Sequence, residues 1–424
     1  MKFSLKKIFS LNTKIDKKSY DFSGLLQRPD VIKLFEIFKS SSIQGEIRFV
    51  GGCVRNVLSN KLVDDIDIAT NLQPEKVKEI LLQNKINFYD VGISHGTITA
   101  VIDKKNFEIT TLRCDVSTDG RHAKVEYTND WSQDAARRDF SINSIYANNQ
   151  GDLFDPNNGK EDLENGLIKF IGNPEERIKE DYLRILRYIR FHISYSKFPH
   201  SQSLKKIIKQ NISGINKISK NRLLDELKKI FYSSDFINLF DDEFSLELLS
   251  LIFPELKNLN IFKKLNSDAI DLLYDKDFIF LIAVLIIDDS DNSDYFIFKY
   301  NISNEDKNRL KFLKKYYKEI NKKKFFNEKN LSAINYYYGN KFTIDIIDLK
   351  IFLSQKVSLN ILNLRNKFVA KPRPIFPVKA KKLIDTYNLK EGRELGVFLK
   401  ELELIWIENN FKISDEEIKK VINK

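Results

Sequence analysis

The stretch FVGGCVRNVLSNKLVDDIDIAT occupies residues 49–70 and places two glycines, an arginine and three aspartates between apolar runs. EIRFVGG predicts a strand that ends in a glycine turn, CVRNVLSN predicts a short helix, and VDDIDIAT alternates as a strand does. Residues two apart in a strand share a face, so Asp65 and Asp67 are expected to project together. Such a pair repels unless a cation joins it, and Mg²⁺ binds carboxylates together with substrate phosphates. The pattern therefore predicts a metal site, unless it is only a solvated acidic turn.

The glycine pair and the arginine before these aspartates suit a phosphate group. Gly51 and Gly52 stand at the end of the first predicted strand, where the lack of side chains lets the backbone approach a polyphosphate. Arg55 lies in the next turn and can reach the same phosphates. An ordinary Gly-Gly turn would explain the glycines alone. The order Gly-Gly, Arg, Asp-x-Asp favours a triphosphate and its metals at one strand edge.

Two further clusters place arginines beside carboxylates. DAARRDFSIN (134–143) contains Arg137, Arg138 and Asp139 in a row, which could equally form surface salt bridges. In EDYLRILRYIRF (180–191), an acid and three arginines recur at every third position of a predicted helix, where successive members are neighbours on the helix surface. These residues are Asp181, Arg184, Arg187 and Arg190. The array could bind base edges and phosphates, or it could be a stripe of salt bridges within the helix.

The composition suits a globular protein with an anionic partner. Of the 424 residues, 42% are apolar and 30% are charged, and the net charge is +11 with an isoelectric point near 9.2. A basic excess favours nucleic acid, although a lysine-rich composition without any partner would give the same charge. The charge concentrates in residues 307–324, which hold nine lysines and arginines and are expected to bind RNA phosphates unless they form only a solvated face. A chain of this length is expected to form two to four domains.

Cysteine content and apolar runs bear on location. The two cysteines, Cys53 and Cys114, predict no disulfide framework and fit a reducing cytosol. The longest apolar run, residues 278–287, has ten residues, whereas a membrane span needs about 20, so it predicts a buried helix. Residues 1–16 contain no apolar core of signal-peptide length. We therefore expect a cytoplasmic protein with no membrane partner.

The pattern of the sequence changes near residue 158. Residues 22–158 mix strand-like runs with helical segments, and GTITAVID and FEITTLRCD predict an antiparallel pair. After the turn-rich connector DPNNGKEDL (155–163), apolar residues recur at helical spacing and strand-like alternation nearly vanishes. The sequence predicts an α+β domain followed by a mostly helical remainder.

These motifs, in this order, resemble those of the class II tRNA nucleotidyltransferases and bacterial poly(A) polymerases, members of the DNA polymerase β-like nucleotidyltransferase superfamily. The family pattern G-G-x-V-R-D … D-x-D is similar to GGCVRN … DDID, with Asn56 in place of the usual aspartate. R-R-D-F-T-x-N is similar to RRDFSIN, and E-D-x-x-R-x-x-R to EDYLRILR. The family's S-x-E-R corresponds to SKNR, with Asn221 replacing the glutamate. The resemblance is specific over residues 48–230 and weaker beyond them.

The resemblance implies a fold and a division into domains. The expected fold is a polymerase-β-like nucleotidyltransferase head with a small mixed sheet, followed by an all-helical neck, body and tail. The catalytic head would span residues 22–158. The neck would span residues 159–235 and bind the nucleotide base and RNA, and the body and tail would span residues 236–424 and bind tRNA. A flexible loop that distinguishes related enzymes from one another could lie within residues 69–90.

The resemblance also assigns catalytic and metal-binding roles. It implies that Asp65 and Asp67 hold two Mg²⁺ ions, one that helps to activate the 3′-hydroxyl of the RNA and one that stabilises the triphosphate and the leaving pyrophosphate. Glu108 lies in a strand predicted to pair nearby and is a candidate third catalytic carboxylate.

Further residues are implied to bind the incoming nucleotide. Those expected at the phosphates are Gly52, Arg55, Arg187 and Arg190. Arg138 and Asp139 would contact the ribose or the triphosphate. Asp181 and Arg184 would hydrogen-bond to the base edge, since a carboxylate and a planar guanidinium can complement the donors and acceptors of cytosine or adenine.

The implied activity is template-independent addition of CCA to the 3′ end of tRNA from CTP and ATP, and no protein partner is implied. A poly(A) polymerase or a CC-only or A-only enzyme of the same family remains an alternative. Residues 91–102, VGISHGTITAVI, are closer to the CCA-adding pattern than to the arginine-rich segment of the poly(A) polymerases. A non-catalytic RNA-binding relative would be expected to lose Asp65 or Asp67, and a surface-binding structural protein would not explain the ordered motifs.

Overall fold

The computed structural model describes residues 21–41, 43, 45–63, 65–117, 124–322 and 324–423. The chain divides into two compact units, Met1–Ser219 and Lys220–Lys424. This division falls inside the neck expected at 159–235, and the proposed boundaries of head, neck and body remain predictions. Residues 1–16, which bear on the expected absence of a signal peptide, lie outside the described residues.

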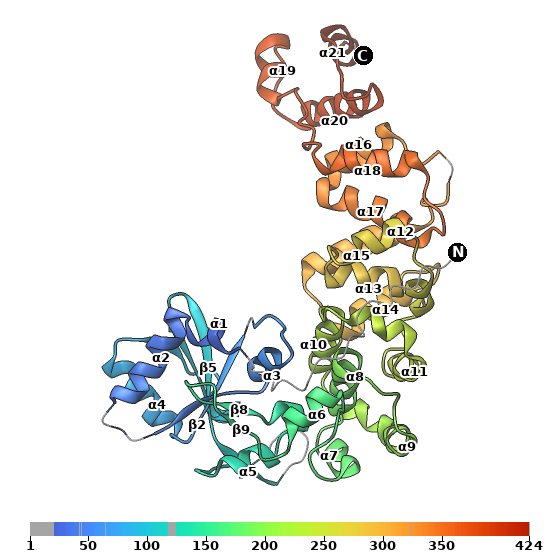
Figure 1. Ribbon diagram of the computed structural model, residues 1–424. Helices are drawn as coiled ribbons and strands as arrows, with labels where there is room; N and C mark the ends of the chain where they lie inside the picture. The colour runs from blue at the N-terminus through green and yellow to red at the C-terminus, as the bar shows by residue number, and fades with distance from the viewer. Residues whose placement is uncertain are drawn as a thin grey trace. The chain divides into compact units, whose positions relative to one another are not determined.

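The first unit combines a sheet with helices (Figure 1). Its strands are β1 (Ile47–Val50), β2 (Ile66–Thr70), β3 (Asn87–Tyr89), β4 (Thr97–Ile102), β5 (Lys105–Thr111), β6 (Arg113–Ser117), β7 (Lys124–Tyr127), β8 (Tyr146–Ala147) and β9 (Leu153–Phe154). Its α-helices are α1 (Ser23–Leu26), α2 (Pro29–Ser40), α3 (Gly52–Leu58), α4 (Pro74–Gln83), α5 (Trp131–Ala136), α6 (Gly159–Asn165), α7 (Pro174–Glu180), α8 (Arg184–Tyr195) and α9 (Gln202–Asn211).

Seven of these strands form a mixed sheet in the order β3-β4-β5-β2-β1-β8-β9. The β2 and β5 strands are parallel, and the other paired neighbours are antiparallel. The β4 strand shows why the sheet forms, because Ile98, Ala100 and Ile102 alternate with more exposed residues and are buried, while α4 packs on β4 and β5. The predicted α+β class with a small mixed sheet is confirmed, as is the predicted antiparallel pair β4–β5.

One sequence-based expectation about this unit is wrong in detail. The strand predicted from VDDIDIAT begins at Ile66, so Asp65 lies just before the strand and not within it. Most of residues 69–90, the range within which a flexible loop was expected, belong to α4 and β3, and the place of that loop remains a prediction. The α4 helix presents Val77, Ile80 and Leu81 at helical spacing, and all three are buried.

The regular elements in the described part of the second unit are helices (Figure 1). The α-helices are α10 (Lys220–Phe231), α11 (Glu243–Ile252), α12 (Ser267–Leu273), α13 (Phe278–Ile286), α14 (Asn292–Tyr300), α15 (Asn304–Tyr317), α16 (Glu328–Tyr338), α17 (Asn340–Leu353), α18 (Leu359–Val369), α19 (Ala380–Tyr387), α20 (Arg393–Glu408) and α21 (Asp415–Ile422). The run predicted to be a buried helix is α13, which packs against α14, α15 and α17.

The basic run 307–324 falls mainly on α15 and is not a uniform cationic face. Arg309 is buried, and its guanidinium donates to both carboxylate oxygens of Asp277 and to Asp345 at 2.6 and 2.8 Å. Such a planar fork is suited to paired carboxylates. Arg309 therefore stabilises the helical core and cannot bind RNA phosphate, which corrects its inclusion in the predicted phosphate-binding run. Lys323 lies outside the described residues.

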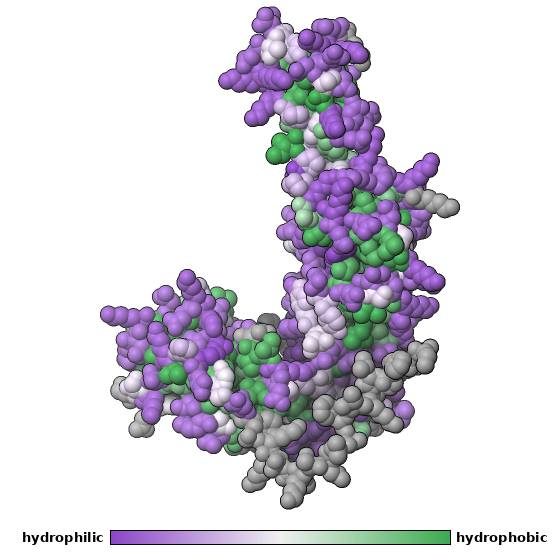
Figure 2. All heavy atoms as spheres, turned by 45° about the horizontal axis from the view of Figure 1, so that its top comes forward, coloured by the Kyte–Doolittle hydropathy of each residue, from purple (hydrophilic) through white to green (hydrophobic). Residues whose placement is uncertain are grey.

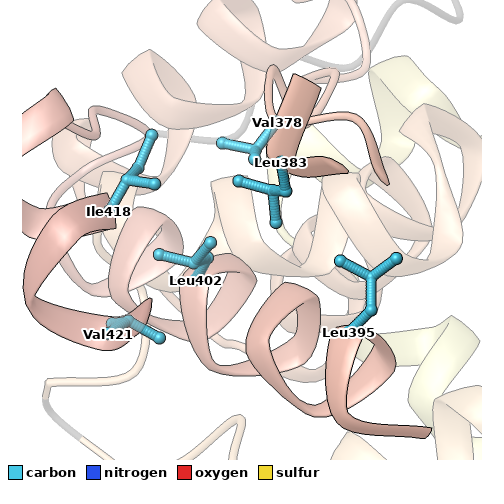
Figure 3. Close-up of a cluster of buried hydrophobic side chains, with 6 residues drawn as sticks. All are labelled: Val378, Leu383, Leu395, Leu402, Ile418 and Val421. Atoms are coloured by element: carbon cyan, nitrogen blue, oxygen red, sulfur yellow. The ribbon is translucent and has the colours of Figure 1, made fainter. Parts of the chain in front are cut away.

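The last three helices share a small core of their own. Leu383 of α19, Leu402 of α20 and Ile418 of α21 point toward one another (Figure 3). The α21 helix begins with a capping box, in which the Ser414 hydroxyl accepts from the Glu417 N–H and the Glu417 carboxylate accepts from the Ser414 N–H. This terminal segment is thus a packed helical module.

On the face seen in Figure 2, hydrophilic residues cover most of the surface of each unit, and small apolar patches lie between them. Among the described residues, the helices are too short or too polar for any of them to span a membrane.

Candidate active site

The centre of the candidate site is a group of carboxylates at the middle of the sheet. Asp67 of β2 stands directly opposite Glu108 of the parallel strand β5. Burial raises the pKa of Asp67, and the charges of Glu108 and Asp65 raise it further, while Arg138 and Arg55 act in the opposite direction. The structure therefore brings together the two expected metal ligands and the candidate third carboxylate, although Asp65 lies just before the strand and not within it.

Two glycines, Gly51 and Gly52, lie beside this group and are together called the glycine cradle. Gly51 has a φ of +70°, in the left-handed region that favours glycine, and it leads into α3. A Cβ atom at Gly52 would lie 3.8 Å from Nη2 of Arg55 and 4.0 Å from Oδ2 of Asp67. A Cβ at Gly51 would lie 3.6 Å from Nη1 of Arg138. Because these glycines have no side chains, space remains between the Asp67 carboxylate and the guanidinium groups of Arg55 and Arg138. An anion such as a phosphate could occupy this space next to a cation held by the carboxylate.

Arg55 is held in this position by several contacts. Its guanidinium carbon lies 4.9 Å from the ring centroid of Phe191 and 5.2 Å from that of Tyr195, both on α8. Its Nη1 donates to the side-chain oxygen of Asn143. Its Nε is buried without a hydrogen-bond partner among the described residues. A buried guanidinium with an unused donor has the chemistry of an anion ligand.

The asparagine that replaces the usual family aspartate has a defined role here. Nδ2 of Asn56 donates to the carbonyl of Leu62 at 2.9 Å, and its Oδ1 accepts from the Tyr195 hydroxyl at 3.2 Å. An ionised aspartate could accept but could not donate. Asn56 therefore satisfies two neighbours at once and helps to keep Tyr195 beside the Arg55 guanidinium.

A chain of hydrogen bonds links Arg55 to the arginine helix. Nδ2 of Asn143 donates to Oδ1 of Asp139 at 2.9 Å, and Nε of Arg187 donates to Oδ2 of Asp139 at 2.6 Å. Burial by itself would raise the pKa of Asp139, but the charge and hydrogen bond of Arg187, together with Asn143 and the Phe140 N–H, lower it to about 2. Asp139 therefore links Arg187 directly, and Arg55 through Asn143, which are two of the expected phosphate ligands. The resemblance had implied for Asp139 only a contact with the ribose or the triphosphate.

This arrangement predicts how Asp139 affects stability against pH. The pKa of Asp139 is about 2 in the folded protein, below the ordinary 3.8, so its ionised form stabilises the fold fully above about pH 4. That contribution is lost as the pH falls through 2. We expect the difference in unfolding free energy between wild type and Asp139→Asn, measured by urea titration, to be largest at neutral pH and to shrink below pH 4. A difference that is constant from pH 7 to pH 2.5 would contradict the ionised pair.

Arg138 is held by a carboxylate that sequence analysis did not single out. Asp134 is buried in α5, and its Oδ2 accepts from Arg138 at 3.2 Å and from the Tyr146 hydroxyl at 2.6 Å. Its Oδ1 accepts from Nε of Arg137 at 2.8 Å. Burial would raise the pKa of Asp134, but the two arginines and Tyr146 lower it to about 2. Asp134 thus orients Arg138 beside the glycine cradle.

Sequence analysis did not identify Asp134 and Asn143 as site residues, and only Asp134 lies in a local pattern that could have identified it. Asp134 stands three and four residues before Arg137 and Arg138, a spacing that predicts ion pairs on a helix. Asn143 lies in the RRDFSIN motif, but its partner Arg55 is 88 positions away. No local pattern identifies such a contact.

The expected helical array from Asp181 to Arg190 is not continuous. Asp181 follows the end of α7 in an extended conformation, and α8 begins only at Arg184. Arg184 donates to Glu180 and to the carbonyl of Arg177, at 2.5 and 2.7 Å. The prediction that Asp181 and the three arginines lie on one continuous helix is therefore wrong, because the chain turns between Asp181 and Arg184.

The later arginines of the array reach different partners. Arg187 binds Asp139, as described above, and its guanidinium carbon also lies 5.5 Å from the ring centroid of Phe191. The Arg190 guanidinium carbon lies 4.2 Å from the same centroid. Arg187 and Arg190 are thus grouped around the aromatic side chain that also contacts Arg55, whereas Arg184 pairs with Glu180 instead.

Comparisons with known proteins match two parts of the chain to described families and the whole chain to a curated relative. Residues 47–169 match the family described as "Poly A polymerase head domain", and residues 197–259 match "Probable RNA and SrmB- binding site of polymerase A". The CCA tRNA nucleotidyltransferase 1, mitochondrial, of Danio rerio is 34% identical over 412 residues, which cover 95% of this chain and 92% of the relative.

Solved structures share the fold. The Bacillus stearothermophilus CCA-adding enzyme in complex with CTP superposes with a TM-score of 0.72 at 21% identity, covering 93% of this chain and 98% of that one. The Thermotoga maritima CCA-adding enzyme complexed with tRNA_CCA gives a TM-score of 0.61 at 19% identity, covering 95% and 98%. The expected head with a mixed sheet and helical remainder is confirmed. From the identity and coverage of its curated relative, we conclude that the chain belongs to the CCA tRNA nucleotidyltransferase family.

Proposed function

We propose that this protein adds CCA to the 3′ end of tRNA, using CTP and ATP and releasing pyrophosphate. The proposal rests on one observation: the carboxylates of Asp67 and Glu108 lie on paired strands, and Gly52 of the glycine cradle leaves space between Asp67 and the Arg55 guanidinium. Nucleotidyl transfer needs a cation site beside an anion site, and these carboxylates would hold a divalent metal next to the residues that would bind the triphosphate. The names of the relatives supply the substrate, tRNA, and the added sequence.

The family implies a divalent metal, and the carboxylates fit one. Asp67 is half-buried opposite Glu108, and burial and the charge of Glu108 raise its pKa, so a bound cation would be favoured there. We propose that Asp65, Asp67 and Glu108 hold Mg²⁺, which prefers oxygen ligands and shares them with phosphates. Bound there, the metal supplies charge stabilisation and activation of the RNA 3′-hydroxyl.

The protein's own groups would orient the nucleotide. We propose that Arg55, Arg138, Arg187 and Arg190 bind the triphosphate, with Gly52 giving it room. Asp139 would fix the Arg187 guanidinium and could accept from a ribose hydroxyl. Asp181 and Arg184 would hydrogen-bond to the base, so that protein side chains replace a nucleic-acid template.

Arg184→Ala tests base selection. Without its donors the pocket should still hold ribose and triphosphate, so discrimination should fall more than catalysis. A bidentate base contact gives about 1–3 kcal/mol in DNA readers, or roughly 5- to 150-fold. We expect UTP and GTP to compete better by such a factor in single-nucleotide incorporation on tRNA lacking CCA, whereas Arg187→Ala should weaken all four nucleotides alike. Full selectivity in Arg184→Ala would place the base-reading residue elsewhere.

The helical remainder is proposed to bind tRNA by shape and phosphate contacts. Within the basic run, Lys311 and Lys318 are exposed, whereas Arg309 is buried in ion pairs. The exposed lysines are the proposed phosphate ligands. A cytoplasmic location remains a prediction that rests on the two cysteines.

The product is tested directly by tRNA transcripts that end before CCA, in C or in CC, each given CTP or ATP alone. CCA addition predicts that CTP extends the first by two nucleotides and the second by one, and that ATP extends the third by one. A CC-only enzyme would leave the third transcript unextended, and a poly(A) polymerase would extend with ATP without stopping.

A further inference from the structure

Asp181, the proposed acceptor for the base, is placed by a turn and not by a helix. Its backbone is extended, with φ −151° and ψ 104°. Its carbonyl accepts from the Arg184 N–H at 3.0 Å, and its Oδ1 accepts from the Leu183 N–H at 3.2 Å. The direction of the carboxylate therefore depends on what keeps this turn in place.

The residue at the centre of the turn, Tyr182, lies against a glycine from a distant segment. Gly214 is buried in the short 3₁₀-helix Ile212–Lys217. A Cβ atom at Gly214 would lie 1.9 Å from Cε1 and 2.2 Å from Cδ1 of the Tyr182 ring. The ring thus occupies the space that any side chain at this position would need. The Lys217 ammonium lies 5.6 Å from the ring centroid.

The contact cannot be kept if Gly214 acquires a side chain. Contacts below 3.0 Å force a shift, and a rigid aromatic ring cannot yield by bending at its end. The φ of Gly214 does not lie in the left-handed region, so alanine is compatible with its backbone. A change to alanine would therefore act through the Tyr182 ring.

We propose that Gly214 is a positioning residue for base selection, because it seats Tyr182 and thereby fixes the turn that presents Asp181. The inference rests on the proposed role of Asp181 and Arg184 in reading the base. Arg184 is also held by Glu180, so a shift of the turn changes the spacing between the two base-reading groups. The carboxylates and the glycine cradle lie on β2, β5 and α3 and do not depend on Tyr182.

The test is Gly214→Ala in the full chain, with kcat/KM measured for CTP, ATP, UTP and GTP on tRNA lacking CCA or ending in CC. We expect the preference for CTP over UTP to fall by about tenfold, within the range of a base contact. Tyr182→Phe keeps the ring and should retain the preference, whereas Tyr182→Ala should lose it. Gly396→Ala is the matched control, because a Cβ there has no atom within 4 Å.

A purely structural role would change the four nucleotides by one common factor, since it alters only the amount of folded enzyme. An equal loss for all four, or an unchanged preference, would therefore overturn the inference. If Gly214→Ala does not fold, Tyr182→Ala decides by the same criterion. If Arg184→Ala also leaves the preference unchanged, the proposed base-reading role fails; if only Arg184→Ala alters it, that role stands and the positioning role of Gly214 is wrong.

Discussion

Replacing Asp67 with asparagine should reduce nucleotide incorporation by about 10³-fold or more while the protein remains folded. Asp67 is the most buried of the three carboxylates at the proposed metal site and faces Glu108 directly. Asparagine keeps the shape but removes the charge that a divalent cation needs. The loss should appear in kcat for CTP and ATP equally, because the metal contacts phosphates and not bases.

The same change should not weaken the fold in the absence of metal. Because the pKa of Asp67 is raised, its ionised form is disfavoured in the folded state and costs stability at neutral pH. Thermal unfolding in EDTA should therefore show an equal or higher midpoint for Asp67→Asn. Asp103→Asn is a matched control, because Asp103 is exposed in the turn between β4 and β5 at φ 50°, which asparagine also tolerates. Near wild-type incorporation by Asp67→Asn would contradict the metal assignment.

Asp134→Ala is expected to be the most destabilising single change at this site. It would leave the guanidinium groups of Arg137 and Arg138 without their shared carboxylate, and the Tyr146 hydroxyl without its acceptor. Removing one partner of a buried ion pair typically costs about 3–5 kcal/mol. Urea unfolding at pH 7 measures this loss. Where the protein is still folded, incorporation should fall with all four nucleotides, because Arg138 is no longer oriented.

Asp130→Ala provides the comparison on the same helix. Asp130 caps α5 by accepting from the Ser132 N–H at 2.8 Å and is exposed, so its loss should cost about 1 kcal/mol. If Asp134→Ala destabilised the protein no more than Asp130→Ala, the buried network would not have the role assigned to it.

Local patterns predicted much of the fold and the centre of the site. The alternation around Asp67 predicted the strand β2, and the glycine pair predicted the turn before α3. The apolar run 278–287 predicted the buried helix α13. These features depend on neighbours in sequence, so periodicity and turn chemistry are sufficient to identify them. The resemblance to a known family then supplied the order of the motifs and their roles.

Features that depend on tertiary contacts could not be predicted in this way. The three-residue spacing suggested that Asp181 belongs to the arginine helix, but the chain turns there and Tyr182 packs against Gly214. The charge of Arg309 suggested an RNA ligand, but Asp277 and Asp345 enclose it. In each case the partner is distant in sequence, and composition alone does not distinguish a buried cation from an exposed one.

The most direct test of the account is the sequence of what the protein adds when every nucleotide is available. A tRNA transcript that ends before CCA is incubated with the protein, Mg²⁺ and equal concentrations of all four nucleoside triphosphates, and the new 3′ ends are sequenced. The account predicts that the added sequence is CCA, that extension then stops, and that Asp67→Asn adds nothing. Tails of adenosine, mixed additions, or unchanged activity of Asp67→Asn would contradict it.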